Sequence, residues 1–129
     1  MPWILQAFTS HIPNFCVLAL HKLVPPVLRT LLEEAYAALD GFLLPGHVST
    51  IIGLEPYAFL ADKYQVPGVV GGFNAQEILL ALCILAQAFV TQKPSITNAY
   101  PKAVTTLGNP KACELMAEVF EPKTALWRG

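Results

Sequence analysis

The chain has 129 residues, of which 54% are hydrophobic and 13% are charged, and its formal net charge is −1 at pH 7. This length suits a domain that can bury a core, and we expect residues 1–129 to form a single α/β domain. The near-neutral charge gives no electrostatic basis for binding nucleic acid or an anionic membrane, so neither partner is expected.

The apolar segments are too short to cross a membrane. The longest run that is both uncharged and continuously apolar, residues 78–86, is far below the about 20 residues that a spanning helix needs. No basic residue precedes the apolar N-terminal stretch, which argues against a secretory signal, so a cytoplasmic location is expected. The three cysteines, Cys16, Cys83 and Cys113, are widely spaced and odd in number, so we expect neither a disulfide framework nor a metal site among them.

Alternating apolar runs and helical patterns predict an α/β fold with an open, mostly parallel sheet of three to four strands. Helices on both faces of this sheet would give a Rossmann-like, three-layer arrangement. Taken in chain order, the predicted strands are residues 14–20, 42–44 and 69–70, with a short fourth strand within 95–100. The predicted helices are residues 25–39, 48–52, 56–64 and 75–90, and a last helix from Pro110 to about Phe120.

Prolines and an asparagine mark where some of these helices begin. Pro25 or Pro26 suits a first helical turn, and Asn109 can cap the helix that Pro110 opens. The helix over residues 75–90 is apolar almost all round, which is typical of a helix enclosed between a sheet and a further layer. Apolar surface left uncovered would favour self-association.

The most informative stretch is residues 41–53, GFLLPGHVSTIIG. It predicts a buried strand, a turn forced by Pro45 and Gly46, the histidine His47, and a helix capped by Ser49 or Thr50. In open α/β sheets, ligands bind beyond the carboxyl ends of the strands, which is where His47 falls. The simpler alternative is an ordinary connection between a strand and a helix, with a hydrogen-bonded histidine.

Two further turns carry small or polar residues after predicted strands. His21 and Lys22 follow the first strand, and Gly71 and Gly72 follow the third. Right-handed crossovers would bring the strand ends to one edge of the sheet, so we expect these turns to converge there with His47. The predicted ligand-facing residues are His21, Lys22, Gly46, His47, Ser49, Thr50, Gly71 and Gly72.

The chemistry predicted for this edge is binding rather than catalysis. A lone histidine is a poor metal site, so we interpret His47 as a hydrogen-bonding or orienting residue and expect no metal ligands. The two glycines permit close backbone approach, but the G-x-G-x-x-G fingerprint of dinucleotide binding is absent. The sequence also contains no Ser-His-Asp order, nucleophile elbow or P-loop, so we assign no catalytic residue.

Five short blocks occur in order along the chain: HKLVPP, PGHVSTIIG, VVGGF, GNPKA and VFEP…WRG. In this order and at these spacings they resemble the hydrogenase formation proteins of the HypD family, from about Asn14 to the last residue. Each block alone has little specificity, whereas the ordered set is specific. Relatives commonly have Gly-Phe-Glu where this chain has Gly72-Phe73-Asn74, so that carboxylate is missing here.

The resemblance implies a role in assembling the Fe(CN)2CO centre of nickel–iron hydrogenases. It implies a scaffold that holds iron together with a HypC-type small chaperone, while a HypE-type partner delivers cyanide. It also implies that Trp127 and Arg128 lie at a domain junction. Family members are about three times longer and carry cysteine motifs and a [4Fe–4S] cluster outside the matching region. We therefore expect the chain to be an internal piece, incomplete by itself, that corresponds to a middle domain.

Two alternatives stay open at this point. The chain could be a stand-alone α/β domain that binds a small anionic metabolite at the His47 edge. It could also be the nonfunctional product of a truncated reading frame.

Overall fold

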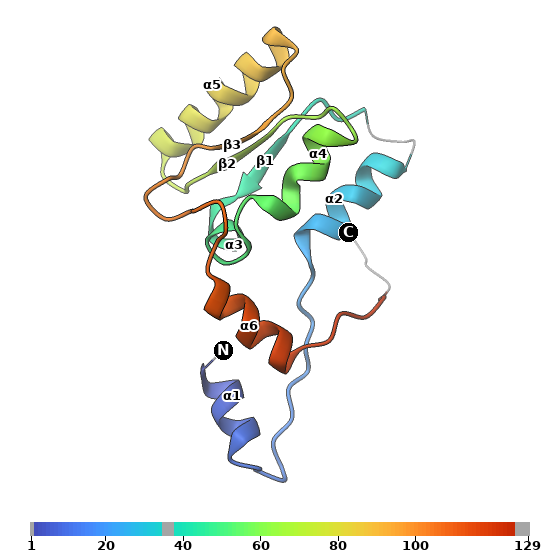
Figure 1. Cartoon of the computed structure of the whole chain (residues 1–129), viewed down its shortest axis with the longest axis vertical. Coiled ribbons are helices and arrows are strands. Elements are labelled where there is room, and N and C mark those ends of the chain that lie inside the picture. Colours follow the sequence, from blue (N-terminus) through green and yellow to red (C-terminus); the bar gives the residue numbers. More distant parts are fainter. Residues whose placement is uncertain (1, 35–37, 126–129) are drawn as a thin grey trace. The chain divides into compact units, whose positions relative to one another are not determined.

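The computed structural model describes residues 2–34 and 38–125, and Figure 1 labels their helices and strands. The chain divides into two compact units. One unit spans residues 21–110, and the other combines the N-terminal residues up to Leu20 with the residues from Lys111 onward. The helices are α1 (Pro2–Thr9), α2 (Val24–Glu33), α3 (Gly46–Ile52), the 3-10 helix η1 (Glu55–Tyr57), α4 (Ala58–Asp62), α5 (Ala75–Thr91) and α6 (Pro110–Val119). In the described ranges, no helix is both long enough and apolar enough to span a membrane.

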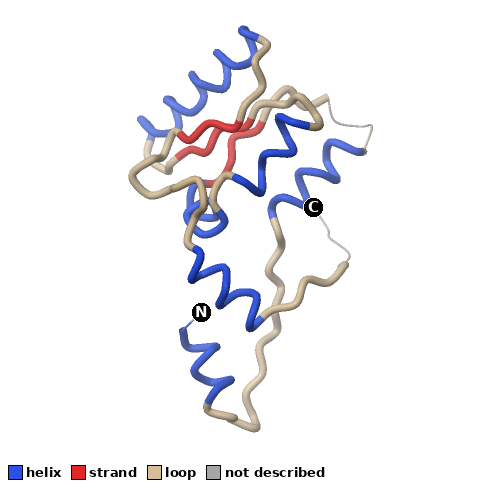
Figure 2. The backbone as a smooth tube through the Cα atoms, in the orientation of Figure 1, coloured by secondary structure: helices blue, strands red, loops and turns tan. Residues whose placement is uncertain are grey.

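A parallel sheet organises the unit of residues 21–110. Its strands are β1 (Phe42–Pro45), β2 (Gly68–Gly71) and β3 (Ile96–Asn98), in the order β1-β2-β3. Both pairings are parallel, so the three strands end at the same edge of the sheet (Figure 2). The predicted open α/β fold is therefore confirmed.

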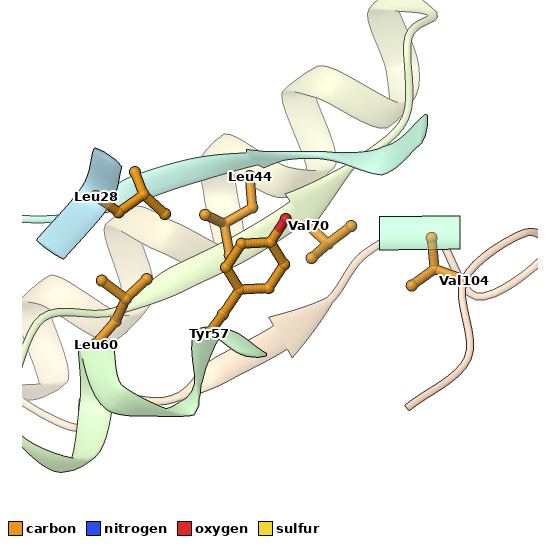
Figure 3. Packing of buried hydrophobic residues seen from close by; sticks show 6 residues of the cluster. All are labelled: Leu28, Leu44, Tyr57, Leu60, Val70 and Val104. Carbon is orange, nitrogen blue, oxygen red and sulfur yellow. The ribbon is translucent and has the colours of Figure 1, made fainter. Parts of the chain in front are cut away.

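Successive residues of β2 point to opposite faces of the sheet, and helices cover both faces (Figure 1). Val69 packs with Ala81 of α5 on one face. Val70 lies on the other face, in the main hydrophobic cluster with residues of α2, η1 and α4 (Figure 3). That cluster consists of Leu28, Leu44, Tyr57, Leu60, Val70 and Val104. Because both faces are buried, β2 can be apolar without alternation, and all four of its residues are buried.

The strand predicted at residues 14–20 is wrong. Residues 15–23 form no regular element, and every residue from His11 to Leu23 is exposed. A strand is stable only when a neighbouring strand pairs its N–H and C=O groups, and β1, the strand expected to follow it, pairs with β2. Helix α2 begins one residue before Pro25 and leaves helical geometry at Glu34. The end predicted for this helix, at Leu39, lies beyond residues 35–37, which fall outside the described residues.

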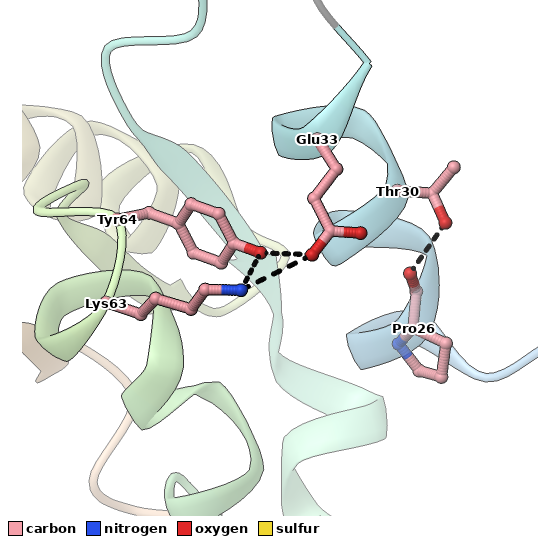
Figure 4. Close-up of polar contacts among 5 residues, drawn as sticks. All are labelled: Pro26, Thr30, Glu33, Lys63 and Tyr64. Carbon is pink, nitrogen blue, oxygen red and sulfur yellow. Dashed lines mark hydrogen bonds and ion pairs between the residues drawn. The ribbon is translucent and has the colours of Figure 1, made fainter.

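A polar cluster joins α2 to the end of α4 (Figure 4). The Tyr64 hydroxyl donates to Oε1 of Glu33 at 2.5 Å, and Nζ of Lys63 lies 2.9 Å from the Tyr64 oxygen and 3.4 Å from the same Glu33 oxygen. The hydrogen bond from Tyr64, and then the bond and charge of Lys63, lower the pKa of Glu33. Because Glu33 and Lys63 are largely exposed, water screens the pair, and the ion pair contributes little to stability.

The buried faces predict a sharp difference between two Leu→Ala substitutions on helices. Leu60 of α4 has no exposed surface, whereas Leu79 of α5 is 63% exposed. Leu60→Ala leaves a cavity in the main cluster, so we expect the free energy of unfolding to fall by about 2–5 kcal/mol. Leu79→Ala serves as the matched control, with an expected change within about 0.5 kcal/mol. Urea denaturation of the two variants measures both values, and equal losses would contradict this packing.

Candidate functional site

The turn after β1 packs directly against the end of β2. Gly46 is the first residue of α3, and a Cβ atom at this position would overlap the carbonyl oxygen of Gly71. The same Cβ would lie 3.0 Å from Cδ1 of Tyr100, in the segment that follows β3. Only glycine lets these three segments come so close. The carboxyl ends of all three strands are therefore packed into one compact edge.

His47 stands on this edge with its side chain exposed. Its ring centroid lies 5.3 Å from that of Phe73, and the two ring planes meet at 44°. Phe73 follows Gly71 and Gly72 directly, and it is itself 58% exposed. The structure thus brings together two of the predicted turns, the one that carries His47 and the one that carries the two glycines.

The side chain of Glu77 stabilises the turn between β2 and α5 by hydrogen bonds. Its Oε2 accepts hydrogen bonds from the backbone N–H groups of Phe73, at 2.9 Å, and Asn74, at 3.3 Å. Asn74 in turn accepts from the backbone N–H of Glu77 at 2.9 Å, so the two residues form a reciprocal cap at the start of α5. A Cβ atom at Gly72 would overlap the Glu77 carboxylate, so a larger residue there would displace this side chain.

Lys102 forms an ion pair with the other oxygen of Glu77. Its Nζ also lies 5.2 Å from the ring centroid of Tyr100. The hydrogen bond from Lys102 is the main cause that lowers the pKa of Glu77, and the N–H groups of Asn74 and Phe73 add to it against the opposing effect of burial. The same pair raises the pKa of Lys102. Because Glu77 compensates this positive charge, Lys102 offers little attraction to a free anion, which weakens the interpretation as an anion-binding domain.

The prediction that Ser49 or Thr50 caps the helix is wrong. Helix α3 begins at Gly46, with Pro45 as its N-terminal flanking residue, so both hydroxyl side chains lie inside the helix. Ser49 donates to the carbonyl oxygen of Pro45 at 2.9 Å, and Thr50 donates to that of His47 at 2.7 Å. Ser49 is also fully buried, so it presents no surface to a ligand. Contact of the half-buried Thr50 with a ligand stays a prediction.

The predicted glycines serve internal packing at this edge. Gly46, Gly71 and Gly72 are all buried, and the space that a side chain would take is filled by backbone or by neighbouring side chains. Close approach of another segment, rather than of a ligand, is therefore what their lack of a side chain permits. His47 is the predicted residue that this packing leaves exposed on the edge.

Two further pairs of residues were predicted to have a role in binding or at a domain junction. His21 and Lys22 are exposed and precede α2, but the strand that was expected to place them there does not form in residues 15–23. Their position beside His47 stays a prediction. Trp127 and Arg128, predicted at a domain junction, lie outside the described residues.

Sequence reasoning missed four residues of the edge: Phe73, Glu77, Tyr100 and Lys102. One signal could have found Glu77, because an asparagine followed three residues later by glutamate, ahead of an apolar run, is the spacing of a capping box. No local pattern indicates the pairing of Glu77 with Lys102, which comes from the segment after β3.

Two glycines lock the far end of α3 to the GNPKA block. Gly53 and Gly108 have φ angles of +74° and +68°, which residues with side chains rarely adopt. The backbone N–H of Leu54 donates to the carbonyl oxygen of Thr106 at 2.8 Å, and that of Asn109 donates to Ile51 at 2.9 Å. Helix α3, which carries His47, is therefore fixed at both of its ends.

These features define an open α/β domain with a tightly packed site at the strand ends, on which the side chain of His47 is exposed. The chain belongs to the HypD family, whose model, described as "Hydrogenase formation hypA family", matches residues 2–129. The predicted resemblance is thereby confirmed.

Several curated relatives carry matching names. The chain is 41% identical over 116 residues to a putative hydrogenase expression/formation protein of Methanocaldococcus jannaschii, a match that covers 90% of this chain and 32% of the relative. It is 37% identical to the hydrogenase maturation factor HypD of Rhodobacter capsulatus and 35% identical to that of Escherichia coli. Those two matches cover 96% of this chain and 33% and 34% of the relatives. The chain therefore spans about a third of the length of the curated relatives that it matches.

The ion pair at the edge predicts a pH-dependent effect of Glu77→Gln. Because folding lowers the pKa of Glu77, its carboxylate stabilises the fold above the unfolded-state pKa of about 4.3, and this contribution is lost as the pH falls through the folded-state value. Folding also raises the pKa of Lys102, mainly through Glu77, so the lysine's contribution is lost as the pH rises through its folded-state value, and in acid it disappears together with the charge of Glu77.

We therefore expect Glu77→Gln to lower the Tm at neutral pH and to have progressively less effect as the solution is acidified. Circular dichroism melts of both proteins between about pH 2 and pH 8 measure this difference. Glu55→Gln, which replaces an exposed glutamate of η1, is the matched control and should change the Tm little at any pH. A Tm difference for Glu77→Gln that stays constant into acid would speak against the ion pair.

Proposed function

We propose that this chain forms one wall of a HypD-type scaffold on which the Fe(CN)2CO centre of nickel–iron hydrogenases is assembled. Membership of a family of hydrogenase maturation factors supports the process, and the match over residues 2–129 supports a role for this unit in it. Because the chain spans a third of its relatives, assembly would also need parts that correspond to the rest of those proteins. The iron centre is the cargo of this process and not a resident group of the chain.

The observation that carries the proposal is the exposed imidazole of His47 on a rigid edge. Buried glycines fix the backbone on both sides of it, and Phe73 contacts its ring. An imidazole can donate or accept a proton near neutral pH, and a side chain that is already oriented loses less entropy when it binds. We assign His47 the role of a hydrogen-bonding residue that meets the cargo or the small chaperone that carries it.

The residues that the structure describes do not fit a resident metal or cluster. Within residues 2–34 and 38–125, no three His, Cys, Asp or Glu side chains are grouped so that they could hold a metal ion. Cys16 and Cys83 are exposed and Cys113 is half-buried. We therefore assign neither the iron–sulfur cluster of the family nor its redox chemistry to these residues.

Helix α5 offers a docking surface for the partners in this proposal. Several of its large apolar side chains are exposed, among them Leu79, Leu80, Leu82, Phe89 and Val90. Exposed apolar surface of this kind marks interaction sites in proteins. A HypC-type chaperone and a HypE-type cyanide donor are the partners that we propose for the assembled scaffold. Self-association through the same apolar surface stays a prediction.

Binding to a purified HypC-type chaperone tests the role of His47. We expect the chain to bind this chaperone. His47→Ala should raise the Kd by about tenfold, or about 1.4 kcal/mol, as for one lost hydrogen bond. His11→Ala, which removes an exposed histidine of the other unit, is the matched control and should leave the Kd unchanged. Isothermal titration calorimetry measures all three values.

Two results would overturn this assignment. One is a chain that does not bind the chaperone at all, and the other is a His47→Ala variant that binds like the wild type. The equivalent substitution in the Escherichia coli relative extends the test to the process itself, because it should reduce the yield of active nickel–iron hydrogenase in cells.

A further inference from the structure

We infer that Glu77 is a positioning residue for His47 and acts on it through Phe73. The inference rests on the proposed function, in which the His47 imidazole is the group that meets the cargo or its carrier. It adds a residue to the site and a reason why the edge contains a nearly buried carboxylate. The Glu77 side chain is 15% exposed, whereas that of His47 is exposed, so we assign Glu77 a supporting role and not contact with a ligand.

In the first step of this link, Glu77 is hydrogen-bonded to the backbone of Phe73. Oε2 of Glu77 accepts from the N–H groups of two successive residues, Phe73 and Asn74, at 2.9 and 3.3 Å. The carboxylate fills the space beside Gly72 that a side chain would otherwise take. The turn that carries Phe73 is thus built around this carboxylate, and removing it would leave the turn without its central acceptor.

The second step fixes Glu77 from the opposite side. Lys102 pairs with Oε1, so the carboxylate cannot turn away from the two amides without breaking the ion pair. Lys102 lies over the ring of Tyr100, and the backbone N–H of Tyr100 donates to Oδ1 of Asn98, the last residue of β3, at 2.9 Å. Glu77 therefore ties the turn after β2 to the segment after β3.

The third step passes from Phe73 to His47. The two rings lie 5.3 Å apart between centroids, in a tilted arrangement that is favourable for aromatic pairs. Both side chains are exposed, so each ring is oriented by its backbone and by the other ring. A shift of the Phe73 backbone would move the surface against which the imidazole rests. Loss of the Glu77 carboxylate would thereby change the position of the His47 ring by way of Phe73.

Nuclear magnetic resonance of the full chain tests this link. The ring protons of His47, assigned by comparison with His47→Ala, report the ring current of Phe73, and Phe73→Leu gives their positions when that ring is absent. In Glu77→Ala we expect the His47 signals to move from the wild-type positions toward those of Phe73→Leu. Glu77→Gln keeps an oxygen acceptor for the amides and should move them less. Gln76→Ala, which replaces an exposed neighbour on the same helix, is the control and should not move them.

The outcomes decide between a positioning role and a merely structural one. A folded Glu77→Ala variant whose His47 signals stay at the wild-type positions would overturn the inference. If Glu77→Ala does not fold, Glu77→Gln and Lys102→Met carry the same test. Each removes the ion pair between residues 77 and 102 but leaves an oxygen at position 77 that can accept hydrogen bonds from the backbone N–H groups of Phe73 and Asn74. A change in Tm without a change in the His47 signals would mean that Glu77 only stabilises the fold.

Binding to the HypC-type chaperone separates this inference from the proposed function. If the proposed function and the positioning role both hold, Glu77→Ala raises the Kd by no more than His47→Ala does. The double variant then binds like His47→Ala alone, because Glu77 affects binding only through His47. If His47→Ala binds like the wild type while the signals still respond to Glu77, the proposed function fails and the positioning role stands. Additive losses of affinity would show that Glu77 acts independently of His47.

Discussion

The close contact between Gly46 and the end of β2 is the constraint on which the rest of the edge depends. With no side chain at Gly46, the first turn of α3 can lie against the Gly71 carbonyl and beside the Tyr100 ring. Any larger residue would push the strand ends apart. The same contact orients α3 so that His47 faces outward, next to Phe73. A packing requirement in the interior thus decides where the one exposed imidazole of the edge stands.

The charged side chains at this edge bind to one another and to the backbone. Lys102 and Glu77 compensate each other, and the carboxylate also holds two backbone amides of the turn before α5. The histidine is consequently presented next to a turn whose charges are already paired within the protein. By contrast, α5 exposes large apolar side chains along its length, and an uncovered surface of this kind favours contact with other protein surfaces.

Much of the fold could be predicted because a strand that is buried on both faces of a sheet has a continuously apolar sequence. The runs at residues 42–44 and 69–70 are continuously apolar, and both are strands, at Phe42–Pro45 and Gly68–Gly71. Residues 14–20 have a similar pattern and are not a strand, because pairing needs a neighbour that the local sequence cannot reveal. The prediction that Ser49 or Thr50 caps a helix was wrong because it also depended on contacts between distant segments. Helix α3 starts directly after Pro45, where close packing against Gly71 admits Gly46 as its first residue.

The sequence by itself determined the family, the class of fold and the place of His47 directly after a strand end. Those follow from ordered short blocks, from apolar periodicity and from the Pro-Gly turn, all of which are local properties of the chain. Only the tertiary structure decided that Glu77 pairs with Lys102, that Phe73 contacts His47, and that the glycines make room for protein atoms. These contacts join segments that follow different strands, and their partners are set by how the strands align in the sheet.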